Sequence, residues 1–181
     1  MPGGTFDTVF YSQGPGPSDG GTGPATVSDL RLDKYLVTVG RFRQYVNYLV
    51  GSGGMPPAND SGIHAHLNGG MGLSNSTNPG GYETGWNATD WNSYIATGGA
   101  AASTWDTSLA YGTWTASPGT QENLPIFATW YAAYAFCIWD GGFLPSEDEW
   151  VYAAAGGSQQ RYYPPLGRMA PTFPPPARRA A

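Results

Sequence analysis

The chain has little charge and few basic residues for its length. Only 12% of its 181 residues are charged, and the excess of acidic side chains gives a formal net charge of −5. Proteins that bind nucleic acid neutralise phosphates with clustered Lys and Arg, whereas the eight such residues here are mostly scattered. The composition therefore argues against a nucleic-acid partner.

Long apolar runs and an export signal are also absent. No stretch approaches the roughly twenty apolar residues that a membrane-spanning helix requires, so we expect no membrane span. The N-terminus, Met1-Pro2-Gly3-Gly4, has neither the basic region nor the apolar core of a signal peptide. The compartment is left open, although the low charge and the wealth of Trp, Tyr, Asn and Gly favour an exported parent protein.

The chain contains a single cysteine, Cys137, which excludes an internal disulfide. It lies in a run of Trp, Tyr, Phe and Ile, and no residue near it in the sequence would lower the pKa of its thiol. The sequence therefore predicts a buried thiol that acts as a small hydrophobic group.

Turn-forming residues, in contrast, are plentiful. The chain has 27 Gly and 16 Pro, and its 40% hydrophobic residues suffice for the core of one domain. We expect one domain with sparse regular structure and long irregular connections.

A first helix is predicted after Thr38, a residue typical of the N-cap position. Apolar residues then recur at i, i+3, i+4, i+7 and i+8, and Gly51 ends the pattern. Arg41 and Arg43 fall between the apolar positions, so we expect both on a solvated face of the helix. The apolar positions are Phe42, Tyr45, Val46, Leu49 and Val50.

Two further helices are predicted later in the chain. Thr129 caps one that Gly141-Gly142 stops, and Ser146 caps another that Gly156-Gly157 stops. Ser146 and Glu149 have the spacing of a capping box, in which each side chain accepts a hydrogen bond from the backbone N–H of the other residue.

The three consecutive acids Glu147, Asp148 and Glu149 suggest acid chemistry or cation binding as an alternative to capping. Consecutive residues of a helix point in different directions, and negative charge near a helix N-terminus is favourable in itself. We therefore assign these acids to the start of a helix at about Glu147 and predict no catalytic residue among them.

The two histidines of the chain, His64 and His66, lie two residues apart. In a strand both rings would point to one side and could seed a metal site with Asp60. Their surroundings are typical of a loop, and no third ligand has a convincing spacing. We predict no metal-binding residue here, and no nucleotide-binding or nucleophile motif indicates a catalytic or cofactor-binding residue elsewhere.

The remaining segments differ in the strength of their patterns. Residues 27–37 are predicted to form β structure because an apolar stretch near their end suits a covered strand. Residues 51–124 show no clear period, and a segment of such length is usually functional or disordered. Its tryptophans favour order, since burial stabilises an indole. They are Trp86, Trp91, Trp105 and Trp114.

Two blocks of the sequence resemble a known family. Residues 125–164 contain, in order, an apolar stretch after Pro125, the run Ala-Phe-Cys-Ile-Trp, a Gly-Gly pair at 141–142, the block Leu-Pro-Ser-Glu-Asp-Glu-Trp at 144–150, a second Gly-Gly pair at 156–157 and a Tyr-Pro pair at 163–164. Upstream, residues 24–38 end in Tyr-Leu-Val-Thr. The order and spacing resemble those of the formylglycine-generating enzymes, also called the sulfatase-modifying factor family.

The resemblance implies an α+β domain over residues 4–164. It implies the C-type-lectin-like fold of that family, with few short helices and strands and much irregular coil, incomplete at the C-terminus. Family enzymes use copper and molecular oxygen to convert a sulfatase cysteine to formylglycine, and they also bind calcium. In the family the copper-binding cysteine pair and the calcium ligands lie beyond the resembling part, so we expect neither cofactor in this chain.

The chain departs from the family pattern after residue 164. Residues 165–181 are rich in Pro and Arg and contain no acid, so we expect an unstructured tail. Our hypothesis is a shifted reading frame, which translation of the other frames past that point tests. Upstream, Phe143, Val151 and Leu36 replace charged residues that are usual in the family.

Three functions are compatible with the sequence. In the first, the chain is part of a formylglycine-generating oxygenase, and we expect the chain by itself to be inactive because it has only one cysteine. Alternatively, it belongs to a non-catalytic, exported bacterial module, such as a lipoprotein, that binds a sulfatase peptide, another peptide or a glycan through aromatic loops. The third alternative is a remnant without function. A cysteine pair downstream in the full reading frame would discriminate among them.

Overall fold

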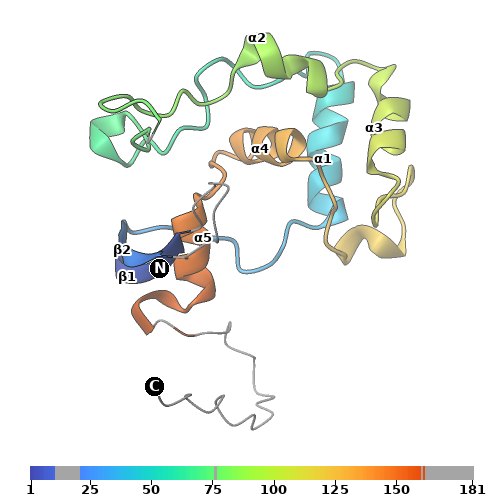
Figure 1. Cartoon of the computed structure of the whole chain (residues 1–181). Helices are drawn as coiled ribbons and strands as arrows, with labels where there is room; N and C mark the ends of the chain where they lie inside the picture. The colour runs from blue at the N-terminus through green and yellow to red at the C-terminus, as the bar shows by residue number, and fades with distance from the viewer. Residues whose placement is uncertain (11–20, 76, 160, 162–181) are drawn as a thin grey trace, which may run out of the picture. The chain divides into compact units, whose positions relative to one another are not determined.

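The computed structural model describes residues 1–10, 21–75, 77–159 and 161 (Figure 1). The tail at 165–181, predicted to be unstructured, lies outside these residues. The fold is small and of the α+β type, and it divides into two compact units. The first contains Met1–Leu32 and the chain from Pro145 onward, and the second contains Asp33–Leu144.

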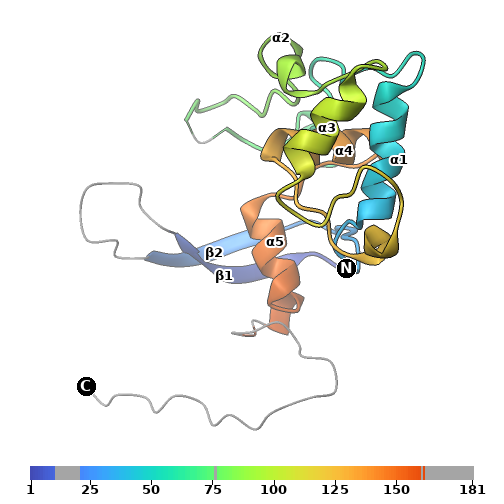
Figure 2. The same cartoon turned by 90° about the vertical axis from the view of Figure 1, so that its right-hand side faces the viewer.

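The first unit is built on a two-stranded antiparallel ribbon. Strand β1 (Gly4–Phe10) lies beside β2 (Gly21–Val27), as Figure 2 shows. In the register of the pair, Gly4 lies opposite Val27. Helix α5 (Glu147–Ala154) and the short 3-10 helix η4 (Gly157–Gln159) complete the unit. Its core consists of Phe6, Val27, Leu30 and Tyr152.

The prediction of β structure over residues 27–37 is wrong. Strand β2 takes in only the first of these residues, and the others form no strand. The Asp29 carboxylate accepts a hydrogen bond from the Gly3 N–H at 2.8 Å, and the Leu30 N–H donates to the Met1 carbonyl at 3.1 Å. These local bonds satisfy backbone groups that would otherwise need a neighbouring strand.

The capping box at the start of α5 is confirmed. The Ser146 hydroxyl accepts from the Glu149 N–H at 3.2 Å, and the Glu149 carboxylate accepts from the Ser146 N–H at 2.8 Å. The helix begins at Glu147, where the cap predicts it.

The second unit contains the other helices. None of the helices in the described ranges is long and apolar enough to cross a bilayer. Helices α1 and α4 confirm the predictions from Thr38 and Thr129, since both threonine hydroxyls accept a hydrogen bond from the first turn. The elements are α1 (Val39–Val50), η1 (Asn68–Gly70), α2 (Ala88–Trp91), η2 (Asn92–Tyr94), α3 (Ala101–Leu109), η3 (Thr120–Asn123) and α4 (Trp130–Trp139).

Helix α3 was not expected from the sequence. It packs beside α1 and buries Ala101, Trp105 and Leu109 at i, i+4 and i+8. Its N-cap is Ala100, which makes no side-chain hydrogen bond, so the usual start signal is missing. The tryptophans do order the long segment, because Trp86, Trp105 and Trp114 are buried.

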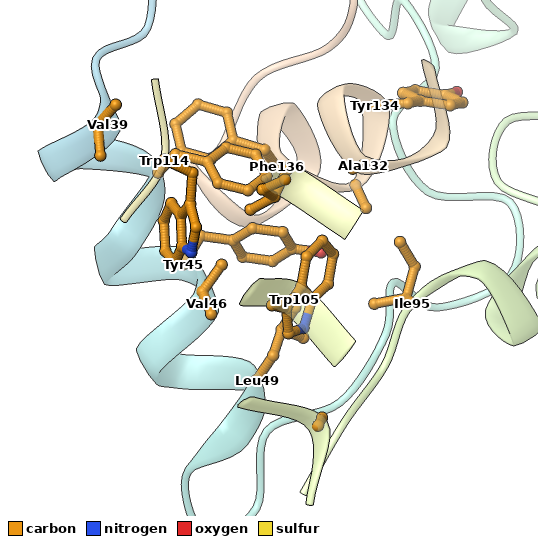
Figure 3. Packing of buried hydrophobic residues seen from close by; sticks show 14 of the residues in the cluster. Val39, Tyr45, Val46, Leu49, Ile95, Trp105, Trp114, Ala132, Tyr134 and Phe136 are labelled. Atoms are coloured by element: carbon orange, nitrogen blue, oxygen red, sulfur yellow. The ribbon is translucent and has the colours of Figure 1, made fainter. Parts of the chain in front are cut away.

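Aromatic rings fill the core of the second unit. Phe42 is 1% exposed, and its ring centroid lies 5.6 Å from Tyr45 and 5.4 Å from Phe136. Trp105 reaches the same cluster from α3, 6.2 Å from Phe42. Figure 3 shows Tyr45, Trp105 and Phe136 converging between the three helices. We call Phe42, Tyr45, Trp105 and Phe136 the core aromatics.

The prediction of a solvated Arg43 is wrong. Its side chain is 8% exposed and forms an ion pair of 2.7 Å with Glu122, and its guanidinium lies 4.1 Å from the centre of the Trp114 ring. Arg41 is more exposed, at 38%, and pairs with Asp33 and Asp140. A buried cation requires such partners, and those of Arg43 come from a distant segment.

Candidate binding surface

The carboxylates of the Leu-Pro-Ser-Glu-Asp-Glu-Trp block have a structural role. Glu149 is 4% exposed, and its carboxylate accepts hydrogen bonds from both the backbone and the hydroxyl of Ser146. Glu147 and Asp148 lie beside it in the first turn of α5, where their charge favours the helix N-terminus. The block therefore marks a helix start.

Cys137 is half-buried in α4. Burial, with smaller effects from Asp140 and Asp33, raises the pKa of the thiol to about 11. A thiol with such a pKa is protonated at physiological pH and is a poor nucleophile and metal ligand. The raised pKa agrees with the prediction of a thiol that acts as a small hydrophobic group, but the residue is half-buried where the sequence predicts a buried one.

His64 belongs to a loop that Glu83 holds together. The Glu83 carboxylate accepts hydrogen bonds from the backbone N–H groups of His64 and Leu73 at 2.7 and 2.8 Å, and it lies 2.9 Å from the Nδ1 of the His64 ring. His64 is 4% exposed. The buried contact between His64 and Glu83 therefore connects the two ends of the loop at residues 64–83.

The histidine rings also pack on Phe143, the residue that replaces a charged residue of the family pattern. Its ring centroid lies 4.3 Å from His64 and 5.1 Å from His66. Asp60 does not join them in a metal site: no group of three or more His, Cys, Asp or Glu side chains within the described ranges is placed to hold a metal ion.

Aromatic side chains from two distant segments meet on the surface of the second unit. Trp91 ends α2 and Tyr94 ends η2, whereas Trp130 and Tyr131 begin α4. We call these four residues the aromatic surface.

The rings of the aromatic surface contact one another in defined orientations. Trp91 lies 5.5 Å from Trp130 with ring planes at 88°, and Trp130 lies 5.2 Å from Tyr131 at 82°. Tyr94 instead stacks on Tyr131, with centroids 4.1 Å apart and planes at 7°. Edge-to-face and stacked contacts each stabilise a ring pair, so the four rings brace one another.

Two buried rings support this surface from beneath. Trp86 is fully buried, lies 5.4 Å from Trp91 and donates its Nε1–H to Asn92 at 2.7 Å. The Tyr134 hydroxyl donates to the Gly62 carbonyl at 3.1 Å. Burial raises the pKa of Tyr134 to about 12, so this hydroxyl retains its proton at physiological pH.

Side-chain caps hold the two backbone segments. The Asn87 amide oxygen accepts from the Asp90 N–H at 3.2 Å, and its nitrogen donates to the Asp90 carboxylate at 2.7 Å. The Asn59 side chain accepts a further N–H from α2 at 3.1 Å. In α4, the Thr129 hydroxyl accepts from the Ala132 N–H at 3.3 Å. The rings therefore stand on capped helix starts.

The aromatic surface is open to solvent at two of its rings. Tyr94 is 57% exposed and Trp130 is 52% exposed, whereas Trp91 and Tyr131 are half-buried. Large aromatic side chains gathered on a surface are typical of binding sites. This arrangement can bind a ligand by stacking.

The tryptophans of residues 51–124 are evident in the sequence, but their meeting with α4 on one surface is not. The two halves of this surface are about forty residues apart in the sequence, and Trp130 lies at the start of a uniformly apolar run. The uniform apolarity of α4 could have indicated it, because a helix that is apolar on all sides cannot bury every one of its rings in one core.

The fold and surface define a small α+β domain with an exposed set of aromatic rings. The chain belongs to the sulfatase-modifying factor enzyme 1-like domain family, whose sequence model matches residues 1–179. This confirms the family predicted from the blocks at 24–38 and 125–164.

Several curated proteins are similar to the chain. A formylglycine-generating enzyme of Thermomonospora curvata is 30% identical over 91% of this chain and 50% of the relative. The inactive C-alpha-formylglycine-generating enzyme 2 of Mus musculus is 39% identical over 29% of this chain and 18% of the relative. The serine/threonine-protein kinase Pkn1 of Chlamydia trachomatis is 43% identical over 26% of this chain and 8% of the relative.

The chain thus spans half or less of the length of these relatives. No solved structure is significantly similar to it.

Proposed function

We propose that this chain is a non-catalytic part of a sulfatase-modifying-factor-like domain that binds a peptide or a glycan through the aromatic surface. The proposal includes the C-type-lectin-like scaffold that the family resemblance implies. The observation that carries it is the exposure of Tyr94 and Trp130 within a set of rings that are otherwise braced and supported.

The donor groups of the chain do not fit the copper of the family enzymes. Copper(I) prefers soft thiolate ligands, and the family site uses a pair of them. Cys137 is the one cysteine of the sequence, and burial raises its pKa to about 11. The chain by itself therefore has no thiolate pair for this metal, and we assign it no oxidation step.

The names of the relatives support a domain that occurs with and without catalysis. One relative is named as an inactive formylglycine-generating enzyme, and another is named as a serine/threonine-protein kinase. A scaffold found in such different proteins is compatible with a binding role.

A binding panel tests the proposal. The immobilised chain is exposed to soluble polysaccharides and to extended peptides, including a Cys-x-Pro-x-Arg sulfatase peptide. We expect at least one class to bind the chain and to lose affinity with Trp130→Ala. Trp150→Ala is the matched control, because Trp150 is 53% exposed and belongs to the first unit. Binding that both variants retain would refute the assignment to the aromatic surface, and no binding at all would refute the proposal and favour a remnant.

Formylglycine formation by a longer parent protein is the second candidate. The 30% identity to the Thermomonospora curvata enzyme over most of this chain favours it. We expect no formylglycine in the Cys-x-Pro-x-Arg peptide after incubation with this chain, copper and oxygen, as measured by mass spectrometry. Product formed by this chain would overturn the non-catalytic assignment, and a downstream cysteine pair in the full reading frame would favour a catalytic parent that also binds calcium.

A further inference from the structure

We propose that the ligand of the aromatic surface is a neutral glycan, bound by stacking of sugar rings on Tyr94 and Trp130. This inference rests on the proposed binding function and deepens it by naming the ligand class. Three observations support it: the geometry of the open rings, the low charge of the segments that carry them, and the hydrogen bonds that already occupy the backbone N–H groups of those segments.

Tyr94 has one open face. Tyr131 covers the other face, since the two rings are nearly parallel at 4.1 Å. Because Tyr94 is nevertheless 57% exposed, most of its open surface lies on the side away from Tyr131. A flat open ring face suits the C–H-rich face of a pyranose, which packs on it by dispersion and weak C–H contacts.

Trp130 offers a second such ring. Trp91 and Tyr131 meet it at 88° and 82°, and these edge-to-face contacts fix its orientation while half of its surface stays in solvent. Rings that are already fixed lose little conformational entropy when a ligand binds. Tyr94 is parallel to Tyr131 within 7° and Trp130 meets Tyr131 at 82°, so the two open rings are nearly perpendicular and each can stack on a separate sugar unit of a bent chain.

The segments that carry the surface are almost free of charge. Residues 84–100 and 124–139 contain a single charged side chain, Asp90, and neither Lys nor Arg. Acidic glycans, phosphorylated ligands and acidic peptides need cations for recognition, so they do not match this surface. On α2 and η2, Thr89, Asp90 and Ser93 are exposed; Ser93 donates to the Asp90 carbonyl at 3.3 Å and the Asp90 carboxylate accepts from Asn87 at 2.7 Å, so their remaining oxygen lone pairs suit the hydroxyl groups of a neutral sugar.

The backbone under the surface argues against an extended peptide. Extended peptides bind by pairing with a strand edge, whereas these rings stand on short helices. The backbone N–H groups of Trp91, Ile95 and Ala133 already donate to carbonyls one turn earlier, at 2.9, 3.1 and 2.9 Å. These groups are therefore not available to a peptide backbone.

Native affinity electrophoresis of the whole chain tests the inference. The gels contain barley β-glucan, xyloglucan or galactomannan as neutral probes, and polygalacturonate as the acidic probe. We expect at least one neutral polysaccharide to retard the chain, independently of added salt. Losing one stacked ring with Trp130→Ala or Tyr94→Ala is expected to weaken binding up to about tenfold. Tyr94→Phe, which keeps the ring face, and Trp150→Ala are expected to bind as the unchanged chain does.

The outcomes separate the two levels of the proposal. If none of the neutral probes retards the chain while a peptide of the binding panel depends on Trp130, the glycan inference falls and the binding function stands. Retardation by polygalacturonate alone also overturns the glycan inference. So does a Trp130→Ala variant that the neutral gels retard as much as the unchanged chain, provided that its circular dichroism spectrum shows an intact fold. If neither glycans nor peptides bind, both proposals fail.

Discussion

The core aromatics and the aromatic surface are built from the same kinds of residue in the same unit, but they differ in exposure. Phe42 in the core is 1% exposed, whereas Trp130 on the surface is 52% exposed. Both sets contain edge-to-face ring pairs, such as Phe42 with Tyr45 and Trp91 with Trp130. Ring contacts alone therefore do not mark a function. What distinguishes the surface is that its ring contacts leave a large part of two rings open.

The largest expected effect is on the core. Phe42→Ala removes a ring that touches helices α3 and α4, and such truncations cost about 3–5 kcal/mol of the free energy of unfolding. Urea unfolding, followed by tryptophan fluorescence, measures the loss. Phe42→Leu is the control, because it keeps most of the volume and should lose less. A loss for Phe42→Ala no greater than that for Trp130→Ala would contradict the distinction between core and surface.

The alkylation rate of the Cys137 thiol measures how well the folded chain shields this side of α4 from solvent. With a folded pKa of about 11 against an ordinary value of 9.0, alkylation by iodoacetamide at pH 8 should be about a hundredfold slower than in the urea-unfolded chain. Mass spectrometry follows the modified fraction over time. Equal rates in the folded and unfolded chain would show that α4 does not bury this thiol.

Acid should weaken the structure through Glu122. The hydrogen bond from Arg43 lowers the pKa of this carboxyl below the ordinary value of 4.5. Its contribution to stability is therefore complete above pH 4.5 and is lost as the pH falls through the lower, folded pKa. Glu122→Gln should flatten the acid side of the stability curve measured by thermal unfolding. An unchanged acid side in this variant would argue against the pairing.

The smallest expected loss of stability is at the aromatic surface. Trp130→Ala should lower the free energy of unfolding by about 1–2 kcal/mol, because only half of the indole is buried in the folded chain. The same variant should bind its ligand up to about tenfold more weakly. Urea unfolding of this variant beside Phe42→Ala makes the comparison directly, and a loss as large as that of Phe42→Ala would make Trp130 a core residue.

Local signals in the sequence were sufficient for three of the helices. The caps at Thr38, Thr129 and Ser146 and the glycines that follow each helix predict α1, α4 and α5, because these signals act within one turn. The β structure predicted over residues 27–37 overlaps strand β2 only at Val27, because Gly21–Val27 contains Pro24 and two glycines, which are uncommon in strands. Helix α3 lacks a side-chain cap and was missed for that reason.

The parts that depend on distant partners were not predictable in this way. Arg43 looked solvated because Glu122, its partner, lies 79 residues away. The aromatic surface likewise depends on the approach of Trp91 and Tyr94 to Trp130, which no local pattern encodes. The sequence block at 144–150 identified the family, whereas the candidate site lies in the second unit, where the sequence is least regular.

The most direct test of the account is an NMR titration of the tryptophan indole Nε1–H signals with the oligosaccharide or peptide that the binding panel selects. We predict that the signals of Trp130 and Trp91 shift, while those of the buried Trp105 and Trp114 stay in place. A titration in which the buried indoles shift as much as Trp130, or in which Trp150 alone responds, would contradict the assignment of binding to the aromatic surface.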